Sequence, residues 1–249
     1  MSAENITRAI KNIFPAAVVA ENDQFIVINK PANVLSIPDR TQSEPSLKDM
    51  LLQKYGNIFT VHRLDRETSG IIIFAKDEAT HKYLSGLFEN RGVDKFYIAL
   101  LQGTLQQKTG LIEAPIMEHP VFKGQMVINK NGKPSVTGYE VLEEMGRYSL
   151  VKFHLHTGRT HQVRVHAKNI GHPIVCDPLY GDGKPILLSS IKKKYKLSKH
   201  DDEEKPMLNR VALHAAELKF TDALDNAVNF SAPLPKDMRA LIEQLKKHA

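Results

Sequence analysis

The strongest structural signal in this sequence is a continuous apolar run at residues 70–76, which reads GIIIFAK. A β-branched and aromatic run without polar alternation predicts a strand buried on both faces. The charged segment HRLDRETSG, residues 62–70, leads directly into it. Because side chains alternate along an extended chain, Arg63 and Asp65 are expected to project from the same side. The sequence therefore places a carboxylate between two arginines, on a loop that a rigid core strand supports.

Taken alone, Asp65 has three possible roles. A carboxylate in this position can act as a nucleophile, as a general base, or as one half of a structural ion pair. For an isolated Arg-x-Asp pattern the ion pair is the commoner outcome. The rest of the chain has to decide among these roles.

Length and composition indicate a folded protein with an anionic partner. The chain has 249 residues, 42% of them apolar, which suffices for a full core. Lys and Arg exceed Asp and Glu by six charges, which favours a polyanionic partner. The single cysteine, Cys176, excludes an internal disulfide and suits a reducing compartment. No apolar run approaches the roughly 18 residues of a membrane helix, so we expect a cytoplasmic protein without membrane contact.

The chain alternates predicted strands with predicted helices. We expect a short N-terminal helix within residues 1–15, followed by one domain at 16–249. A polar block at about 182–209, with three lysines and then four acidic residues, is expected to be an exposed insertion. Apolar and polar periodicity predicts strands at 18–20, 24–29, 94–101, 135–142, 148–156 and 211–220, and helices at 46–55, 78–91 and 235–248.

A long acid-free stretch, residues 145–176, holds five Lys or Arg and five His. If a helix starts at Thr160, then His161, Arg164 and Lys168 lie on one face. We therefore expect a basic ridge on an apolar support, which is either a solvated surface or an anion-binding one.

A zinc site is the competing interpretation of the histidines in this stretch. His154, His156 and His161 include a His-x-His pair that can share one face of a strand. No carboxylate or second cysteine is suitably spaced to complete the site. We therefore predict no metal site.

Several segments resemble motifs of the RluA-type pseudouridine synthases. HRLDRETSG at 62–70 resembles the signature of that family, in which the Asp is catalytic. Further segments resemble family motifs in the expected order: KPAN at 30–33, KFYIAL at 95–100, TGRTHQVRVH at 157–166, HPIVCDPLYG at 172–181 and VALHAAELKF at 211–220. The resemblance spans roughly residues 20–235. It implies the fold class α+β: a single pseudouridine-synthase-like domain with a largely antiparallel mixed sheet, flanking helices and a central active-site cleft.

The resemblance also implies roles for individual residues. Asp65 would be the catalytic residue and Arg164 its partner. Tyr97 would lie against the target base, and Leu213 would pack beneath it. Arg63, expected to project beside Asp65, is the candidate to contact the RNA or fill the space that a flipped uridine vacates. The expected supporting residues are Lys30, Pro31, His62, Arg159 and His161.

The sequence departs from the family pattern at three points. Asn33 stands where Gly is common, but Asn tolerates a left-handed backbone, so we expect the turn to persist. Cys176 stands where a small residue is usual, and we expect a buried side chain rather than a nucleophile. Thr221 and Asp222 replace the usual His-Pro, which affects only the turn geometry.

The function implied is isomerisation of uridine to pseudouridine in structured RNA, an rRNA or tRNA stem–loop. The family reaction breaks the N-glycosidic bond, turns the uracil and rejoins it to the ribose through carbon. It needs no cofactor or nucleotide, and we expect a monomer. The alternative is a non-catalytic RNA-binding or ribosome-assembly factor on the same scaffold. Intact Asp65, Tyr97 and Arg164 favour the enzyme over a decayed active site.

Overall fold

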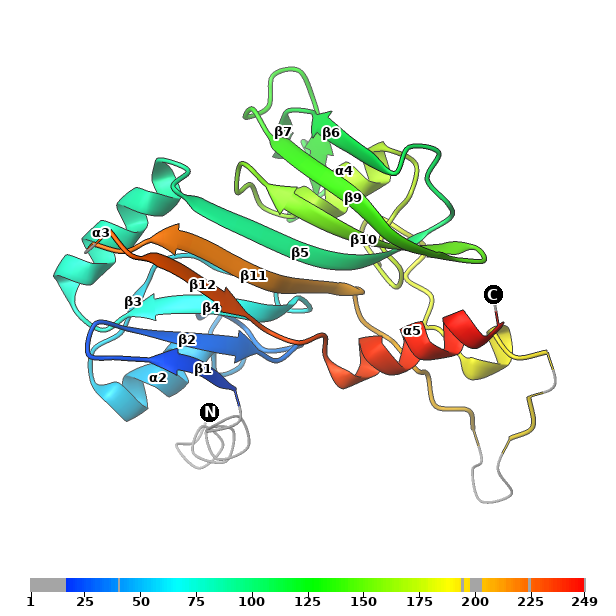
Figure 1. Cartoon of the computed structure of the whole chain (residues 1–249), viewed down its shortest axis with the longest axis horizontal. Coiled ribbons are helices and arrows are strands. Elements are labelled where there is room, and N and C mark those ends of the chain that lie inside the picture. Colours follow the sequence, from blue (N-terminus) through cyan, green and yellow to red (C-terminus); the bar gives the residue numbers. More distant parts are fainter. Residues whose placement is uncertain (1–16, 40, 194, 198–202, 224, 249) are drawn as a thin grey trace. The chain divides into compact units, whose positions relative to one another are not determined.

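The computed structural model describes residues 17–39, 41–193, 195–197, 203–223 and 225–248 (Figure 1). The chain divides into two compact units. Unit 1 comprises residues 1–96 and 215–233, and unit 2 comprises residues 97–214 and 234–249. The helix expected within residues 1–15 lies outside the described residues. Two strands, β5 (Val93–Gln102) and β11 (Leu213–Thr221), have residues in both units.

Unit 1 contains a sheet with the strand order β1-β2-β4-β11. The short strand β3 pairs with β4, and β12 pairs with β11. The pairs β1–β2, β2–β4 and β11–β12 are antiparallel. The bounds are β1 (Val18–Glu21), β2 (Phe25–Lys30), β3 (Phe59–Thr60), β4 (Ser69–Ala75), β12 (Ala227–Ser231), α2 (Leu47–Tyr55) and α3 (Glu78–Glu89).

Strand β4 is the buried strand that the apolar run predicts. All seven of its residues are buried, so the expectation is confirmed. Leu84 of α3 packs in one cluster with Ile71 and Ile73 of this strand. Helical periodicity over residues 78–91 predicts Tyr83 on the inward face, but the residue is 36% exposed. Its hydroxyl donates a hydrogen bond to the carbonyl of Thr221 at 3.0 Å, which draws the ring to the edge of the helix.

Helix α2 begins where its local sequence says it should. Ser46 is the N-cap, and its hydroxyl accepts a hydrogen bond from the N–H of Asp49. The Asp49 carboxylate in turn accepts from the N–H of Ser46, which completes a capping box. Leu47 and Leu51 are fully buried beneath the cap. The helix predicted at 46–55 is confirmed, and Ser46 has the N-cap position that its hydroxyl side chain favours.

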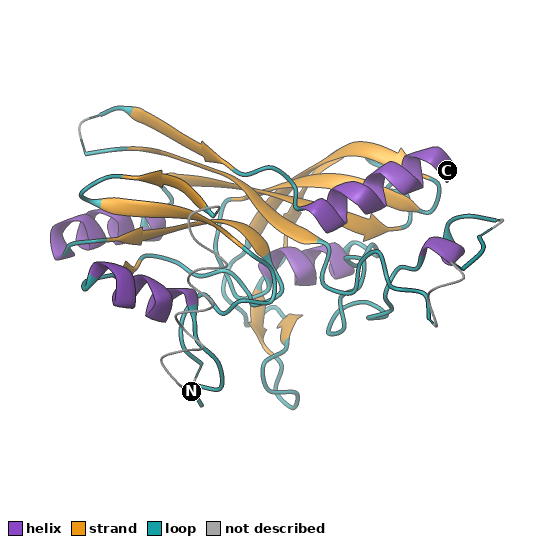
Figure 2. Ribbon diagram, turned by 90° about the horizontal axis from the view of Figure 1, so that it is seen from below, coloured by secondary structure: helices purple, strands orange, loops and turns teal. Residues whose placement is uncertain are grey.

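Unit 2 contains a sheet with the strand order β5-β10-β9-β6 and a separate β7–β8 hairpin. The pairs β9–β10, β6–β9 and β7–β8 are antiparallel. Figure 2 distinguishes the strands from the helices in the described part of the chain. The bounds are β6 (Thr109–Glu113), β7 (Ile116–Glu118), β8 (Met126–Ile128), β9 (Val136–Met145), β10 (Tyr148–Leu155), α4 (Gln162–Asn169), α5 (Lys236–His248) and a 3-10 turn at Leu188–Ser190.

The polar segment at 182–209 is better anchored than its composition suggests. Ile186 and Leu208 form a bridge and are both buried in the core of unit 2. Ile191 and Met207 pack against the same core. The ends of this segment therefore belong to the fold, because four apolar residues among its charges suffice to fix them.

The predicted α+β class with largely antiparallel strand pairing is confirmed. Each unit combines helices with a sheet, and the expected strands and helices occur near their predicted positions. None of the helices in the described ranges has the length and hydropathy that crossing a bilayer requires.

Candidate active site

Asp65 lies in the loop that joins β3 to β4. The loop has no regular secondary structure before a turn at residues 66–67. The carbonyl of Asp65 accepts a hydrogen bond from the N–H of Thr68 at 3.1 Å. Leu64 is 4% exposed, Asp65 is partly buried and Arg63 is exposed. The loop is thus anchored by an apolar residue immediately before its carboxylate.

The backbone on both sides of Asp65 is held by the segment that follows β2. The Leu64 N–H donates to the Ser36 hydroxyl at 3.1 Å, and that hydroxyl donates to the Leu64 carbonyl at 2.8 Å. On the other side, the Lys30 ammonium donates to the Arg66 carbonyl at 3.0 Å. Both Ser36 and Lys30 are buried. The position of Asp65 is therefore set by side chains about 30 residues earlier in the chain.

Lys30 is a buried cation that organises two turns at once. Its ammonium also donates to the carbonyls of Pro31 at 3.0 Å and Val34 at 2.7 Å. Its whole side chain is 0% exposed, which is rare for lysine unless its charge is solvated by acceptors. Asn33, within the same turn, has φ +63°, which confirms the expected left-handed backbone. Lys30 and Pro31 thus support the Asp65 loop from within unit 1.

Replacing Lys30 by Met is expected to destabilise the protein by about 3 kcal/mol or more. Three carbonyls would lose an ammonium donor, and a buried polar group left without a partner costs about 1–3 kcal/mol. The free energy of unfolding from urea titration measures the loss. Lys76→Met is the matched control, because Lys76 bonds Glu21 and Asn22 near the surface and should cost under about 1 kcal/mol. Equal losses in the two variants would contradict the role of Lys30.

Gly70, the last residue of the signature segment, permits a close approach of two strands. Its φ of +116° is one that side-chain-bearing residues rarely adopt. A Cβ at this position would also lie 2.1 Å from the carbonyl oxygen of Ala215 on β11. Only glycine fits here, so the signature ends in glycine for a packing reason.

His62 supports the loop as a neutral ring. Its Nε2 accepts a hydrogen bond from the N–H of Ile73 at 3.2 Å, and its ring stacks on Phe88 with centroids 4.5 Å apart. Burial, with a smaller contribution from the Lys95 ammonium, lowers the pKa of His62 to about 3. The residue as a whole is partly exposed. Its ring, however, is covered by Phe88, and its Nε2 bonds the backbone of Ile73, so burial of the ring is the main cause of the lowered pKa. His62 is therefore a structural residue of unit 1.

Below pH 6.5, the free energy of unfolding is expected to depend on pH partly through His62. Its pKa is depressed in the folded state, so between pH 6.5 and 3 the unfolded chain binds more protons, and stability falls as pH falls. The limiting slope is about 1.4 kcal/mol per pH unit. His62→Gln retains an acceptor for Ile73 but does not titrate. The difference in unfolding free energy between wild type and variant should stay constant above pH 7 and change below pH 6. A constant difference down to pH 4 would contradict this account.

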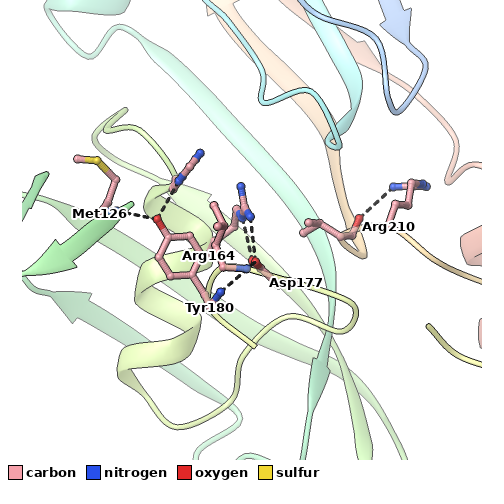
Figure 3. Close-up of polar contacts among 8 residues, drawn as sticks. Met126, Arg164, Asp177, Tyr180 and Arg210 are labelled. Carbon is pink, nitrogen blue, oxygen red and sulfur yellow. Dashed lines mark hydrogen bonds and ion pairs between the residues drawn. The ribbon is translucent and has the colours of Figure 1, made fainter. Parts of the chain in front are cut away.

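In unit 2, Arg164 forms a buried ion pair with Asp177 (Figure 3). Its Nε and Nη2 donate to the two carboxylate oxygens, both at 2.8 Å. Arg164 is 2% exposed and Asp177 is 0% exposed. Asp177 Oδ1 also accepts from the N–H groups of Leu179 and Tyr180. The carboxylate thus fixes the plane of the Arg164 guanidinium, using two of its five N–H donors.

The expected basic ridge is not what this helix forms. Helix α4 begins at Gln162, with His161 as its N-cap in a left-handed conformation at φ +54°. Arg164 is buried, His161 is partly buried, and only Lys168 of the expected trio is exposed. The prediction of a ridge was wrong because helical periodicity places residues on a face without revealing a buried partner. The apolar support is confirmed, since Val163 and Ala167 are buried.

Tyr180 links the start of α4 to the β7–β8 hairpin. Its hydroxyl accepts a hydrogen bond from the Met126 N–H at 2.8 Å and bonds His161 Nδ1 at 2.8 Å. The Arg164 guanidinium lies over its ring, 5.1 Å from the centroid. His161, predicted as a supporting residue, therefore acts through Tyr180 in the network that surrounds Arg164.

Arg159 lies in the turn before α4. Its N–H donates to Gln162 Oε1 at 2.9 Å, and its Nε donates to the Pro134 carbonyl at 3.4 Å. The Gln162 amide donates in turn to the Val136 carbonyl and the Thr137 hydroxyl. This network ties the TGRT turn to β9, so Arg159 is held at a partly exposed position.

Tyr97 and Leu213 belong to the same core cluster of unit 2. Leu213 is 3% exposed, and Tyr97 is partly buried against that cluster. Contact of either residue with a base remains a prediction, as does a catalytic partnership of Arg164 with Asp65.

Cys176 behaves as the expected buried side chain. It is 3% exposed, and burial raises the pKa of its thiol to about 11. A thiol with a raised pKa is a poor nucleophile at neutral pH. Within the described ranges, no group of three or more His, Cys, Asp or Glu is placed to hold a metal ion.

Sequence reasoning missed three residues that organise the site. Asp177 and Tyr180 lie within the HPIVCDPLYG segment but were given no role. The only available signal for the ion pair was that Asp177 follows Arg164 by 13 residues. Ser36 had no signal, because its importance depends on a contact with Leu64, 28 residues away.

Comparison with known proteins shows the family to which the chain belongs. A family model described as RNA pseudouridylate synthase matches residues 24–169. Ribosomal large subunit pseudouridine synthase D of Nitrosomonas europaea is 34% identical over 239 residues, which cover 93% of this chain and 66% of that protein. An uncharacterized RNA pseudouridine synthase, YlyB, of Bacillus subtilis is 33% identical over 238 residues, covering 92% of this chain and 72% of that protein.

Solved structures agree on the fold. Human RNA Pseudouridylate Synthase Domain Containing 4 has a TM-score of 0.76 at 24% identity and covers 98% of each chain. Human RNA Pseudouridylate Synthase Domain Containing 1 has a TM-score of 0.67 at 27% identity, covering 92% of this chain and 94% of that one. Fold and sequence matches together define an isomerase that modifies RNA. The chain belongs to the RNA pseudouridylate synthase family, in its RluA-type branch.

Proposed function

We propose that this protein converts uridines in ribosomal RNA to pseudouridine, with Asp65 as the catalytic carboxylate. The observation that carries the proposal is the Asp65 loop, whose backbone is pinned on both sides of the carboxylate by Ser36 and Lys30. Catalysis needs a reacting group held in a fixed position, and a loop fixed by buried side chains provides that. The matched region also includes Asp65, Tyr97 and Arg164.

The proposed reaction rearranges one nucleotide without a net change in its atoms. The bond between N1 of uracil and C1′ of ribose breaks, and a bond between C5 and C1′ forms. The proton on C5 is lost, and N1 gains one. Nothing is oxidised or hydrolysed, so no cofactor is needed. Asp65 either attacks C1′ or removes the neighbouring 2′ proton, and both routes require an ionised carboxylate.

The remaining site residues have proposed roles that follow from their environments. Arg164, oriented by Asp177, is proposed to hold Asp65 in its charged form. Tyr97 is proposed to stack on the target base and Leu213 to pack beneath it. Arg63, which is exposed, is proposed to contact RNA near the vacated position of the flipped uridine.

Large-subunit rRNA is the proposed substrate because relatives of known name are ribosomal large subunit pseudouridine synthases. A tRNA stem–loop is the other structured RNA with suitable chemistry. The six excess positive charges fit either polyanion. We further propose that the protein is cytoplasmic, because its single buried cysteine suits a reducing compartment. We also propose that it is a monomer.

Pseudouridine mapping tests the proposal. RNA from cells with and without the gene should differ at specific uridines of large-subunit rRNA, and the purified protein should restore those sites on RNA from the deletion strain. If the gene-dependent sites lie only in tRNA, then tRNA and not large-subunit rRNA is the substrate. RNA binding without any pseudouridine formation would instead favour a non-catalytic assembly factor.

A further inference from the structure

The β7–β8 hairpin carries an exposed apolar tip at residues 121–122. Val121 is 73% exposed and Phe122 is 58% exposed, the highest values among large apolar residues in the part of the chain that the structure describes. Neither residue has a role in the proposed catalysis. A large aromatic ring that remains in water at a hairpin tip is a candidate contact for a ligand.

The tip has a well-defined conformation. His119 Nδ1 accepts hydrogen bonds from the N–H groups of Val121 at 3.1 Å and Phe122 at 3.0 Å. The His119 N–H donates to the Gln125 carbonyl at 2.8 Å. The ring centroids of His119 and Phe122 lie 4.7 Å apart. Gly124 completes the turn with φ +79°. The Phe122 ring is thus presented to solvent by an ordered turn, which lowers the entropic cost of binding to it.

The hairpin and the turn after it carry a net positive charge. Residues 118–139 contain three lysines and one acidic residue, Glu118, whose carboxylate accepts a hydrogen bond from the Gly124 N–H at 3.3 Å. Lys123 adjoins Phe122 at the tip, while Lys130 and Lys133 lie in the turn after β8 at the base of the hairpin, and all three are exposed. That turn is bonded to β7, since Ile116 and Lys133 exchange backbone hydrogen bonds at 3.0 and 2.8 Å. Ring and cations therefore belong to one small module.

The module is also joined to the helix that carries Arg164. The Met126 N–H on β8 donates to the Tyr180 hydroxyl (Figure 3). The same hydroxyl bonds His161 Nδ1. Ile116 packs in one cluster with Val165 of α4 and Tyr180. A ligand held at the tip would therefore be held at a fixed position relative to α4.

We propose that this hairpin tip docks single-stranded nucleotides of the RNA substrate, with one unpaired base stacked on Phe122 and its phosphates near Lys123. The inference rests on the proposed RNA-modifying function and adds a binding site to it. An aromatic ring beside cations is how proteins bind unpaired bases, because every base offers a face for stacking. A protein partner fits less well, because the area that two apolar side chains can bury is far smaller than the roughly 800 Å² that each side of a stable interface buries.

Two substitutions of the same residue separate stacking from simple apolar contact. Phe122→Leu keeps an apolar side chain but removes the ring, and it should weaken binding of a fluorescent 12-nucleotide oligouridylate RNA by about 5- to 150-fold. Phe122→Trp should bind at least as tightly as wild type. Leu111→Ala is the matched control, because Leu111 is 57% exposed on β6 of the same unit and should leave affinity within twofold.

The same proteins are tested in single-turnover pseudouridine formation on large-subunit rRNA. If wild type forms pseudouridine and Phe122→Leu binds oligouridylate within twofold of wild type, the docking inference is wrong and the proposed function stands. If Phe122→Leu and Phe122→Trp weaken oligouridylate binding equally, stacking on Phe122 is also refuted. If wild type binds RNA through Phe122 but forms no pseudouridine, the proposed function fails and the docking site remains. Thermal melting of each variant verifies that the hairpin substitutions leave the fold intact.

Discussion

Asp65→Asn is expected to abolish pseudouridine formation while leaving RNA affinity within a few-fold of wild type. The amide has nearly the shape of the carboxylate but is neutral and a poor nucleophile. Loss of a general base costs about 10²–10⁴-fold in rate, and loss of a nucleophile removes the reaction path. Affinity should persist because phosphate contacts dominate RNA binding. Single-turnover assays with saturating protein measure the chemical step apart from binding.

Two companion variants make the Asp65 experiment specific. Asp65→Glu keeps the charge but displaces it by one methylene, and a displacement of about 1 Å can cost about 10²-fold. Glu44→Gln alters a carboxylate that pairs with Arg66 of the same loop at 2.7 Å on the surface, so it should retain turnover. Turnover near wild type in Asp65→Asn, with the other variants behaving as stated, would show that Asp65 is not the catalytic group.

Local sequence patterns predicted the parts of the site that depend on neighbouring residues. The run at 70–76 predicted β4 because an unbroken apolar segment is stable only when both faces are covered. Ser46 predicted the start of α2 because an N-cap serine bonds a backbone N–H three residues later. Asn33 adopts the left-handed conformation that its side chain tolerates. Each of these signals is complete within a few residues.

Long-range contacts account for what the sequence did not reveal. Two of the carbonyls that hold the Lys30 ammonium are local, but the third lies 36 residues away, and no pattern near Lys30 reveals that contact. Arg164 lies at a helical spacing that suits a solvated face, yet Asp177 draws it inside. An ion pair of this kind depends on where the chain returns after the helix. That return is a property of the tertiary fold, so periodicity could not supply it.

Asp177→Asn should lower the free energy of unfolding by about 3–5 kcal/mol, because it leaves the Arg164 charge buried beside a neutral amide. The amide can still accept hydrogen bonds from the backbone of Leu179 and Tyr180, so the loss isolates the ion pair. Urea denaturation gives the free energy, with an unchanged slope expected if the unfolded state is unaffected. Pseudouridine formation should fall as well, since the guanidinium would no longer be held in its plane.

A second substitution in the same protein distinguishes an unpaired charge from a general disturbance of the fold. Arg164→Met combined with Asp177→Asn removes both charges and should recover at least half of the lost stability, because the uncompensated charge is gone. Activity should stay low in the double variant, which lacks the guanidinium. Glu144→Gln breaks an exposed pair with Lys108 and should cost under about 1 kcal/mol. A double variant less stable than Asp177→Asn would mean that Arg164 stabilises the protein chiefly through its packing, since removing an unpaired charge should otherwise be favourable.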